Sequence, residues 1–553
     1  MLDDIIPDFK IDQMKNFTLI ILLSVLSFCT EAQEQPKLVV GVVVDQMRMD
    51  YIYRYWDKYS EDGFKKLMRE GFLCKNAHYN YIPTYTGPGH ASIFTGATPM
   101  NNGIIANNWF DRNENRMVYC VADSTRKGVG TKSDQGKMSP SRLLAPTLGD
   151  AFKVSTQFRG KSIGISIKDR AAILPAGHSA DGAYWMDFET GNFISSDHYM
   201  ESLPKWVKTF NGHKNADKLA KDGWQTLLAI EKYTESTEDN TPYEKIYNEN
   251  GYPVFPYDLP RLIKDKAYYA FANSPFGNTI VRQFAEQAII NEDLGNDEFL
   301  DLLTISFSSP DIIGHAFGPQ SIEIEDTYIR LDLEIAELIS SLNERIGQDN
   351  YTLFLTADHA AAQVPSYLKD HKIPTDYFET ERYEKELDAR LNSTFGEGEW
   401  ILNYSNQQIF LNQNLIESQK VDEEDILKEI NKFSINFPGV ASVLSSSELQ
   451  HPLPQDQFAS MAQNGWSPLR SGDMVIQFLP GWMEYGNQGT THGSSYNYDS
   501  HVPIFFYGFG IKHGVELNPI EITQIAPTIS IITSTAFPML SDHRPIIGAI
   551  KKP

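Results

Sequence analysis

The 553-residue chain is poor in cysteine and in positive charge, and it lacks a long apolar run. Its three cysteines, Cys29, Cys74 and Cys120, show no C-x-x-C spacing, so they are too few for a disulfide framework and do not form a thiolate metal motif. The 48 Lys and Arg against 72 Asp and Glu give a net charge of −24, which argues against general nucleic-acid binding because the chain would repel phosphate backbones. The longest N-terminal apolar run, Phe17–Phe28, is too short to span a bilayer.

Two common catalytic signatures are also missing. The sequence has neither the G-x-S-x-G motif of serine hydrolases nor a Walker A phosphate loop, and it contains no internal repeat or low-complexity tract. Hydrophobic residues make up 41% of the chain and charged residues 22%, which is typical of a globular protein with a sizeable core. The length fits several average domains or one large domain with insertions.

The N-terminal region, residues 1–32, is predicted to be an export signal. Met14-Lys15 provides a short basic start, Phe17–Phe28 an apolar segment and Thr30-Glu31-Ala32 a small-residue cleavage site. The acidic stretch before Met14 fits no signal, so we expect translation to begin at Met14 and the protein to be periplasmic or secreted. Lipid anchoring at Cys29 and a buried first helix are the alternatives. After cleavage, Cys74 and Cys120 could pair or remain free.

The rest of the chain, 33–553, is predicted to be one α/β domain. Short apolar runs rich in β-branched residues predict buried strands, namely Leu38–Val44, Ile163–Ile167, Leu302–Phe307, Tyr351–Thr356 and Val502–Tyr507. Amphipathic helices between them predict a doubly wound, mostly parallel sheet with helices on both faces. Two polar stretches, about 175–295 and 365–488, interrupt this alternation of strands and helices and are interpreted as insertions that cap the core.

Ionisable residues follow four of these predicted strands. Ligands bind outside the carboxyl ends of strands in open α/β sheets, so these residues point to one crevice. They are Asp45, the pair Asp311 and His315, the pair Asp358 and His359, and the pair Lys168 and Arg170. Aspartate and neutral imidazole suit Zn²⁺, and the one-turn spacing of Asp311 and His315 lets both bind one ion. Any one of these residues alone is more typical of a helix cap or a surface turn.

Thr86 is the candidate nucleophile. It lies in the segment Pro83–His90, where Pro and Gly predict a helix that begins near Pro88. A threonine in this place is usually only a helix cap, but a helix N-terminus also stabilises an anion such as an alkoxide or a bound phosphate.

Taken together, the motifs resemble the alkaline phosphatase superfamily, and within it the secreted, phosphate-irrepressible enzymes of flavobacterial type, close to the nucleotide pyrophosphatase/phosphodiesterase branch. The matching segments are Val43–Tyr51, Pro83–Gly96, Gly103–Trp109, Ile167–Arg170, Pro310–Pro319, Thr356–His359 and Thr491–Pro503. They occur in the family's order over most of the chain.

The resemblance implies a phosphomonoesterase with two Zn²⁺ ions per chain and a phosphothreonine intermediate on Thr86. One zinc would be held by Asp311, His315 and His492, and the other by Asp45, Asp358, His359 and the Thr86 oxygen. Asn107, Lys168 and Arg170 match positions that contact the phosphoryl oxygens. The expected partners are small phosphate monoesters, and the expected state is a monomer.

Three alternatives remain open. A phosphodiesterase or nucleotide pyrophosphatase of the same fold is disfavoured because the Lys168–Arg170 pair suits the dianionic monoester better than a diester. A sulfatase needs a C-x-P-x-R or S-x-P-x-R motif, and the nucleophile segment here reads Thr86-Gly87-Pro88-Gly89-His90. A decayed, non-catalytic binding protein should have lost metal ligands, whereas all six Asp and His candidates are present.

Overall fold

Five parallel strands form the centre of the largest sheet in the computed structural model, which describes residues 35–451, 456–541 and 543–551. They are β10 (Tyr351–Thr356), β1 (Leu38–Val44), β9 (Asp301–Phe307), β6 (Ser162–Ser166) and β7 (Gly182–Asp187), in that order across the sheet. Every residue of these strands is buried, as expected for parallel strands that are covered on both faces. The predicted signal region, with Met14 and Cys29, lies outside the described residues.

Antiparallel strands extend both edges of this parallel centre. Next to β10, β15 (His501–Gly508) runs antiparallel and pairs in turn with β2 (Phe72–His78). Next to β7, β8 (Asn192–Ser196) runs antiparallel. Three short strands complete the sheet, namely β5 (Gly128–Val129), β16 (Gly514–Glu516) and β17 (Ile520–Glu521). The predicted α/β class is confirmed, with a mixed sheet whose five central strands are parallel.

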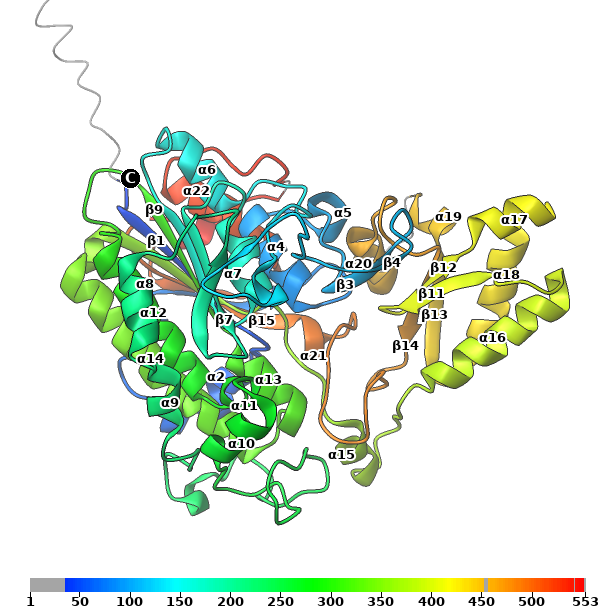
Figure 1. Cartoon of the computed structure of the whole chain (residues 1–553), viewed down its shortest axis with the longest axis horizontal. Helices are drawn as coiled ribbons and strands as arrows, with labels where there is room; N and C mark the ends of the chain where they lie inside the picture. The colour runs from blue at the N-terminus through cyan, green and yellow to red at the C-terminus, as the bar shows by residue number, and fades with distance from the viewer. Residues whose placement is uncertain (1–34, 452–455, 542, 552–553) are drawn as a thin grey trace, which may run out of the picture. The chain divides into compact units, whose positions relative to one another are not determined.

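Helices cover both faces of the sheet (Figure 1). One face carries α12 (Phe276–Asn291) and α14 (Ile322–Arg345), and the other carries α4 (Thr86–Thr95), α6 (Leu148–Ser155), α7 (Asp169–Ala176) and α22 (Ile525–Ile532). The apolar stripe of α14, from Ile324 to Leu342, is buried, and the Ser321 hydroxyl caps the helix by accepting from the Ile324 N–H. No helix within the described residues is both long and apolar enough to cross a membrane.

The segment predicted as the second insertion, 365–488, contains a separate antiparallel sheet with its own apolar core. Its strands are β11 (Ile401–Ser405), β12 (Gln408–Leu411), β14 (Met474–Phe478) and β13 (Val440–Ser445), and its long helices are α16 (Thr380–Phe395) and α18 (Glu423–Ser434). The segment 175–295 departs from the expectation of a cap. It supplies β7 and β8 to the central sheet, and its α12 packs against β9 and β6.

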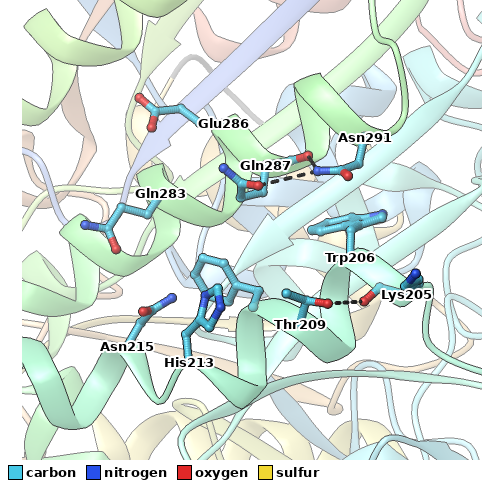
Figure 2. Close-up of a pocket in the computed structure, with 10 residues that line it drawn as sticks. Lys205, Trp206, Thr209, His213, Asn215, Gln283, Glu286, Gln287 and Asn291 are labelled. Carbon is cyan, nitrogen blue, oxygen red and sulfur yellow. Dashed lines mark hydrogen bonds between the residues drawn. The ribbon is translucent and has the colours of Figure 1, made fainter.

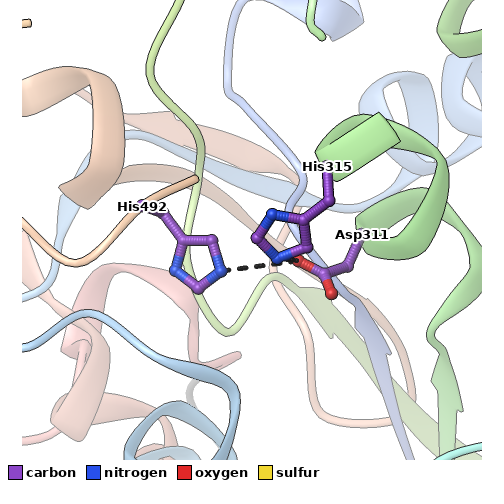
Figure 3. Close-up of side chains that lie close together, drawn as sticks. All are labelled: Asp311, His315 and His492. Carbon is purple, nitrogen blue, oxygen red and sulfur yellow. Dashed lines mark ion pairs between the residues drawn. The ribbon is translucent and has the colours of Figure 1, made fainter. Parts of the chain in front are cut away.

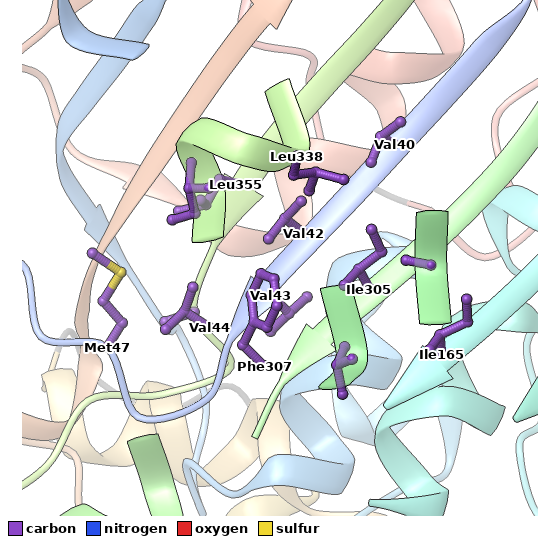
Figure 4. Close-up of a cluster of buried hydrophobic side chains, with 14 of the residues drawn as sticks. Val40, Val42, Val43, Val44, Met47, Ile165, Ile305, Phe307, Leu338 and Leu355 are labelled. Carbon is purple, nitrogen blue, oxygen red and sulfur yellow. The ribbon is translucent and has the colours of Figure 1, made fainter. Parts of the chain in front are cut away.

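Side chains from the central strands and α14 pack around β1 (Figure 4). β1 lies between β9 and β10. Because the side chains of a strand alternate between the two faces of a sheet, those of β1 face both helical layers. At Gly41 the neighbours are so close that an added Cβ would lie 2.7 Å from Phe354 Cζ and 2.9 Å from Phe94 Cε1. The strand that ends at Asp45 is therefore tightly fixed in the core.

Replacing Gly41 with alanine should lower the free energy of unfolding by about 1–3 kcal/mol, because the methyl group overpacks two phenylalanine rings. Chemical denaturation measures the change. Gly212→Ala at the end of α8 (Lys205–Gly212) is the matched control, since no atom lies within 4 Å of its added Cβ. Equal stability of the two variants would show that the core around β1 accommodates the methyl group.

Candidate active site

Three aspartates meet where adjacent parallel strands end. Asp45 directly follows β1, Asp358 comes two residues after β10, and Asp311 lies in α13 (Ser309–Phe317), which begins two residues after β9. The pairing register aligns the strand ends, with Val44 opposite Phe307 and Val43 opposite Thr356. The carboxyl ends of these strands therefore bring together the predicted Asp and His residues.

The first group of possible metal ligands is Asp311, His315 and His492 (Figure 3). One ligand atom from each lies within 4.8 Å of the others. His315 follows Asp311 by one turn of α13, and its Nε2 is 3.2 Å from Asp311 Oδ1. His492 arrives from the loop before α21 (Asn497–Ser500), with its Nε2 3.5 Å from the same oxygen. Both imidazoles thus face one carboxylate oxygen from different parts of the chain.

The second group is Asp45, Asp358 and His359, which are completely buried. His359 Nε2 lies 3.4 Å from Asp45 Oδ1 and 3.6 Å from Asp358 Oδ2. These same three atoms have no hydrogen-bond partner among the described residues. Buried polar atoms are nearly always satisfied, so three unsatisfied atoms that face one another fit a bound cation.

Backbone carbonyls orient all three histidines. Nδ1 of His315 donates to Thr490 O at 2.7 Å, Nδ1 of His492 to Thr84 O at 2.6 Å, and Nδ1 of His359 to Ala360 O at 3.0 Å. Because a carbonyl only accepts, each Nδ1 carries a proton, so Nε2 is the ring nitrogen that could bind a metal. Burial lowers the pKa of His359 and of His492, which favours the neutral form that ligates.

The charge balance of the site is negative. Burial, followed by the charge of Asp45, raises the pKa of Asp358 well above its ordinary range. Burial also acts on Asp311, but His315 and Lys168 outweigh it and hold the pKa of Asp311 well below its usual value. Lys168 Nζ donates to Asp45 Oδ2 at 2.7 Å and to Asp311 Oδ2 at 2.5 Å. Only one ammonium faces the three buried carboxyl groups, so a bound cation would let all three ionise.

Thr86 is the first residue of α4, and it does not act as a helix cap. The N-cap position is Tyr85, without a side-chain cap, and the helix begins two residues earlier than the predicted Pro88. The Thr86 hydroxyl accepts from Arg170 Nη2 at 3.4 Å. An added Cβ at Gly89, one turn along, would lie 2.3 Å from Asp358 O. This glycine lets the N-terminal turn of α4 approach the second ligand group.

The predicted phosphate-contacting residues also reach the site, although not as expected. β6 ends at Ser166, one residue before the predicted end at Ile167, so Lys168 is the N-cap of α7 and Arg170 lies within that helix. Arg170 Nη1 donates to Tyr119 OH at 3.0 Å, while its Nη2 faces Thr86. Asn107 Oδ1 accepts from the Gly87 N–H at 2.7 Å, which leaves the amide NH₂ to donate elsewhere.

Sequence reasoning gave no role to Gln46 or His90. Gln46 joins the two groups, since its N–H donates to Asp358 Oδ1 at 3.1 Å and its Nε2 to Asp311 Oδ1 at 2.7 Å. His90 contacts Thr86 O and Ser306 Oγ, each at 2.9 Å, and burial lowers its pKa to about 4. Both residues lie within the quoted motifs, Gln46 directly after Asp45 and His90 four residues after Thr86. Their contacts depend on tertiary structure, including a left-handed backbone at Gln46 (φ 65°).

A cavity of about 580 Å³ between α8 and α12 contains none of the site residues (Figure 2). It is lined by polar side chains that include His213, Gln283 and Glu286. Cys74 and Cys120 are both buried and free, so the two do not pair in this structure.

Comparison with known proteins gives consistent matches over nearly the whole chain. The family described as type I phosphodiesterase/nucleotide pyrophosphatase matches residues 39–501. A Myroides odoratus protein named calcium-transporting ATPase is 43% identical, over 95% of this chain and 96% of that protein. Alkaline phosphatase PafA of Elizabethkingia meningoseptica is 41% identical, over 94% of this chain and 96% of that protein.

The structural comparison agrees with these matches. The crystal structure of alkaline phosphatase PafA superimposes with a TM-score of 0.91 and 40% identity, over 94% of this chain and all of that one. A second solved form of that protein carries substitutions of a threonine, an asparagine, a lysine and an arginine, the last two separated by one residue.

Replacing His492 with alanine should reduce the metal bound per chain, because it removes one of the three ligand atoms of the first group. Elemental analysis of the purified protein by mass spectrometry measures this. His213→Ala, at an exposed histidine of the distant cavity, is the control. Equal metal content in both variants would contradict a ligand role for His492.

Proposed function

We propose that this chain, which belongs to the type I phosphodiesterase/nucleotide pyrophosphatase family, is a zinc-dependent alkaline phosphatase that hydrolyses phosphate monoesters through a phosphothreonine at Thr86. The observation that carries the proposal is the convergence of two three-residue ligand groups next to a threonine at a helix N-terminus. This arrangement supports a two-metal phosphoryl transfer site.

The relatives support the monoesterase assignment. The resemblance predicted from the motifs to the alkaline phosphatase superfamily is confirmed by matches to alkaline phosphatases at 40% identity or more. The residue types substituted in the second solved form of PafA occur here in the same order, as Thr86, Asn107, Lys168 and Arg170. The name of the family leaves a phosphodiesterase as the second candidate.

The donor atoms fit two zinc ions. Each group combines carboxylate oxygen with imidazole nitrogen, which is the ligand chemistry of Zn²⁺ in catalytic sites, and each supplies three of the four ligands that zinc usually takes. The unsatisfied atoms Asp45 Oδ1, Asp358 Oδ2 and His359 Nε2 are independent support for an ion in the second group. Bound zinc would lower the pKa of the threonine hydroxyl, stabilise the leaving oxygen and activate water.

The chain's own residues position the reacting groups. Thr86 Oγ1 attacks phosphorus, the new O–P bond forms as the ester P–O bond breaks, and the alcohol leaves. Water then cleaves the phosphothreonine and releases inorganic phosphate. His90 contacts the Thr86 carbonyl and Arg170 contacts its hydroxyl, so both hold the nucleophile in place. The N-terminus of α4 adds a partial positive charge next to the phosphoryl group.

The cationic side chains favour a monoester over a diester. A monoester presents three terminal oxygens and a dianionic charge, whereas a diester replaces one oxygen with an organic group. Lys168 has three donor hydrogens and uses two of them on Asp45 and Asp311, so one is left for substrate. Arg170 supplies a planar fork, and Asn107 a free amide donor.

The remaining predictions complete the proposal. The apolar run Phe17–Phe28 supports export to the periplasm or beyond, with cleavage near Ala32. The mature chain from residue 33 is proposed to act as one catalytic domain and as a monomer.

Replacing Thr86 with alanine should lower turnover of p-nitrophenyl phosphate by about three orders of magnitude or more, because no nucleophilic oxygen remains. Thr86→Ser retains a hydroxyl and should keep a substantial part of the activity. Steady-state kinetics at matched zinc content measures both variants. An alanine variant as active as wild type would rule out the proposed nucleophile.

Replacing Lys168 and Arg170 together with alanine should reduce hydrolysis of p-nitrophenyl phosphate by about a hundredfold or more, because two cationic donors to the phosphoryl oxygens are lost. Hydrolysis of the bis(p-nitrophenyl) ester should fall much less. Arg170→Ala alone, with the Lys168 contacts intact, separates the loss of substrate contacts from a loss of zinc. Equal losses on the two substrates would contradict the proposal that Lys168 and Arg170 favour the dianionic monoester.

A further inference from the structure

Arg170 is held by a tyrosine to which the proposed mechanism gives no role. Tyr119 is the last residue of β4 (Arg116–Tyr119), and its hydroxyl accepts from Arg170 Nη1 at 3.0 Å. The same hydroxyl donates to Asp169 Oδ1 at 2.5 Å. Arg170 Nη2 lies 3.4 Å from the Thr86 hydroxyl. One end of the guanidinium is therefore fixed by the chain, while the other end points to the proposed nucleophile.

The remaining nitrogen of the guanidinium gives no further support. Arg170 Nε is buried and has no hydrogen-bond partner among the described residues. Within the same residues, the guanidinium donates only to Tyr119 and Thr86. Tyr119 is thus the one partner that can orient this side chain from outside the reacting groups.

The carboxylate of Asp169 sets the direction of the Tyr119 hydroxyl hydrogen. An ionised carboxylate only accepts, so the phenol donates to Asp169 and presents its lone pairs to the guanidinium, which only donates. Burial raises the pKa of Tyr119 well above its ordinary range, although Arg170 opposes this effect. The phenol therefore keeps its proton, and with it the bond to Asp169, at alkaline pH.

The hairpin that carries Tyr119 also carries Asn107. Tyr119 pairs with Asn108, which begins β3 (Asn108–Asp111), and the Cys120 N–H donates to Asn107 O at 2.9 Å. Two of the three predicted phosphate-contacting residues therefore depend on this hairpin, Asn107 at its base and Arg170 through the Tyr119 hydroxyl.

Buried side chains join the hairpin to the helices of the site. They form one apolar cluster, which includes Trp109 and Val118 from the hairpin, Ile173 from α7 and Ala91 from α4. Protein interiors are close-packed, so such a shared cluster fixes the hairpin relative to both helices. The Tyr119 hydroxyl is thereby a rigid support for the guanidinium.

We propose that Tyr119, oriented by Asp169, is a positioning residue that holds Arg170 in the conformation that contacts the phosphoryl oxygens. This role rests on the proposed function, because Arg170 has such contacts only if the site binds a phosphate ester. An unsupported arginine side chain samples many rotamers, and those that face away from the substrate lower the fraction of protein that is ready to react. The bond to Tyr119 removes this loss before substrate binds.

A double-mutant cycle tests this role. Wild type, Tyr119→Phe, Arg170→Ala and the double variant are compared by kcat/KM for p-nitrophenyl phosphate at matched zinc content. Tyr119→Phe should lower kcat/KM by about tenfold or more while Arg170 is present, because a hydrogen bond to a charged group is lost. In the Arg170→Ala background the same substitution should change kcat/KM by less than about twofold, because the group that it positions is already absent.

Two further readouts separate positioning from a general loss of structure. In Tyr119→Phe, hydrolysis of the bis(p-nitrophenyl) ester should fall much less than hydrolysis of the monoester, and inorganic phosphate should become a weaker inhibitor. Asp169→Asn removes the charge that orients the phenol, so it should cause a smaller loss in the same direction. It also provides a second variant if Tyr119→Phe does not fold.

Tyr383→Phe is the matched control. Tyr383 is fully buried in the apolar core of the second sheet, and its hydroxyl lies 2.6 Å from Ser434 Oγ. This variant also loses a tyrosine hydrogen bond, but it should leave kcat/KM and inhibition by phosphate unchanged.

Two results would overturn the proposal. One is a Tyr119→Phe variant as active on p-nitrophenyl phosphate as wild type. The other is an equal loss from Tyr119→Phe in the presence and absence of Arg170, which would mean that the hydroxyl acts independently of the guanidinium. A wild-type protein that hydrolyses no phosphate monoester would contradict the proposed function itself, so the two failures can be distinguished.

Discussion

The structure depends on three carboxylates buried side by side at the ends of neighbouring parallel strands. Removing a carboxylate from water costs several kcal/mol even after relaxation, and Asp45, Asp311 and Asp358 repel one another as well. Lys168 offsets part of this cost through contacts with two of them. The rest requires further positive charge, and the unsatisfied atoms of the second group lie where that charge would sit. An acidic protein thereby creates a local site for an anionic substrate.

Contacts with the surrounding chain fix the positions of the side chains in this site. Carbonyls of Thr84, Ala360 and Thr490 orient the three imidazoles, and Gln46 connects the two ligand groups. These contacts come from segments far apart in the chain, which the central sheet brings together. The loop around Tyr243 and Lys245 adds further support, because it forms backbone hydrogen bonds with Ala316, next to His315, and with Gly489, in the loop that carries His492.

Much of this arrangement can be predicted from the sequence. Apolar, β-branched runs are reliable signs of buried strands, and β1 and β10 match their predicted bounds. Aspartates that directly follow such runs indicate a site at the carboxyl ends of the strands. His492 could be assigned only through the family resemblance, because it lies in a loop whose position is set by tertiary contacts. The same reason explains Gln46, and the polar composition of 175–295 concealed β7 and β8.

The proposed chemistry requires two zinc ions beside Thr86. Anomalous X-ray scattering recorded from crystals on both sides of the zinc absorption edge would locate them. We expect two zinc peaks about 4 Å apart, one among Asp311, His315 and His492 and one among Asp45, Asp358 and His359. Crystals grown with zinc that show no peak at either group, or peaks only elsewhere, would contradict it.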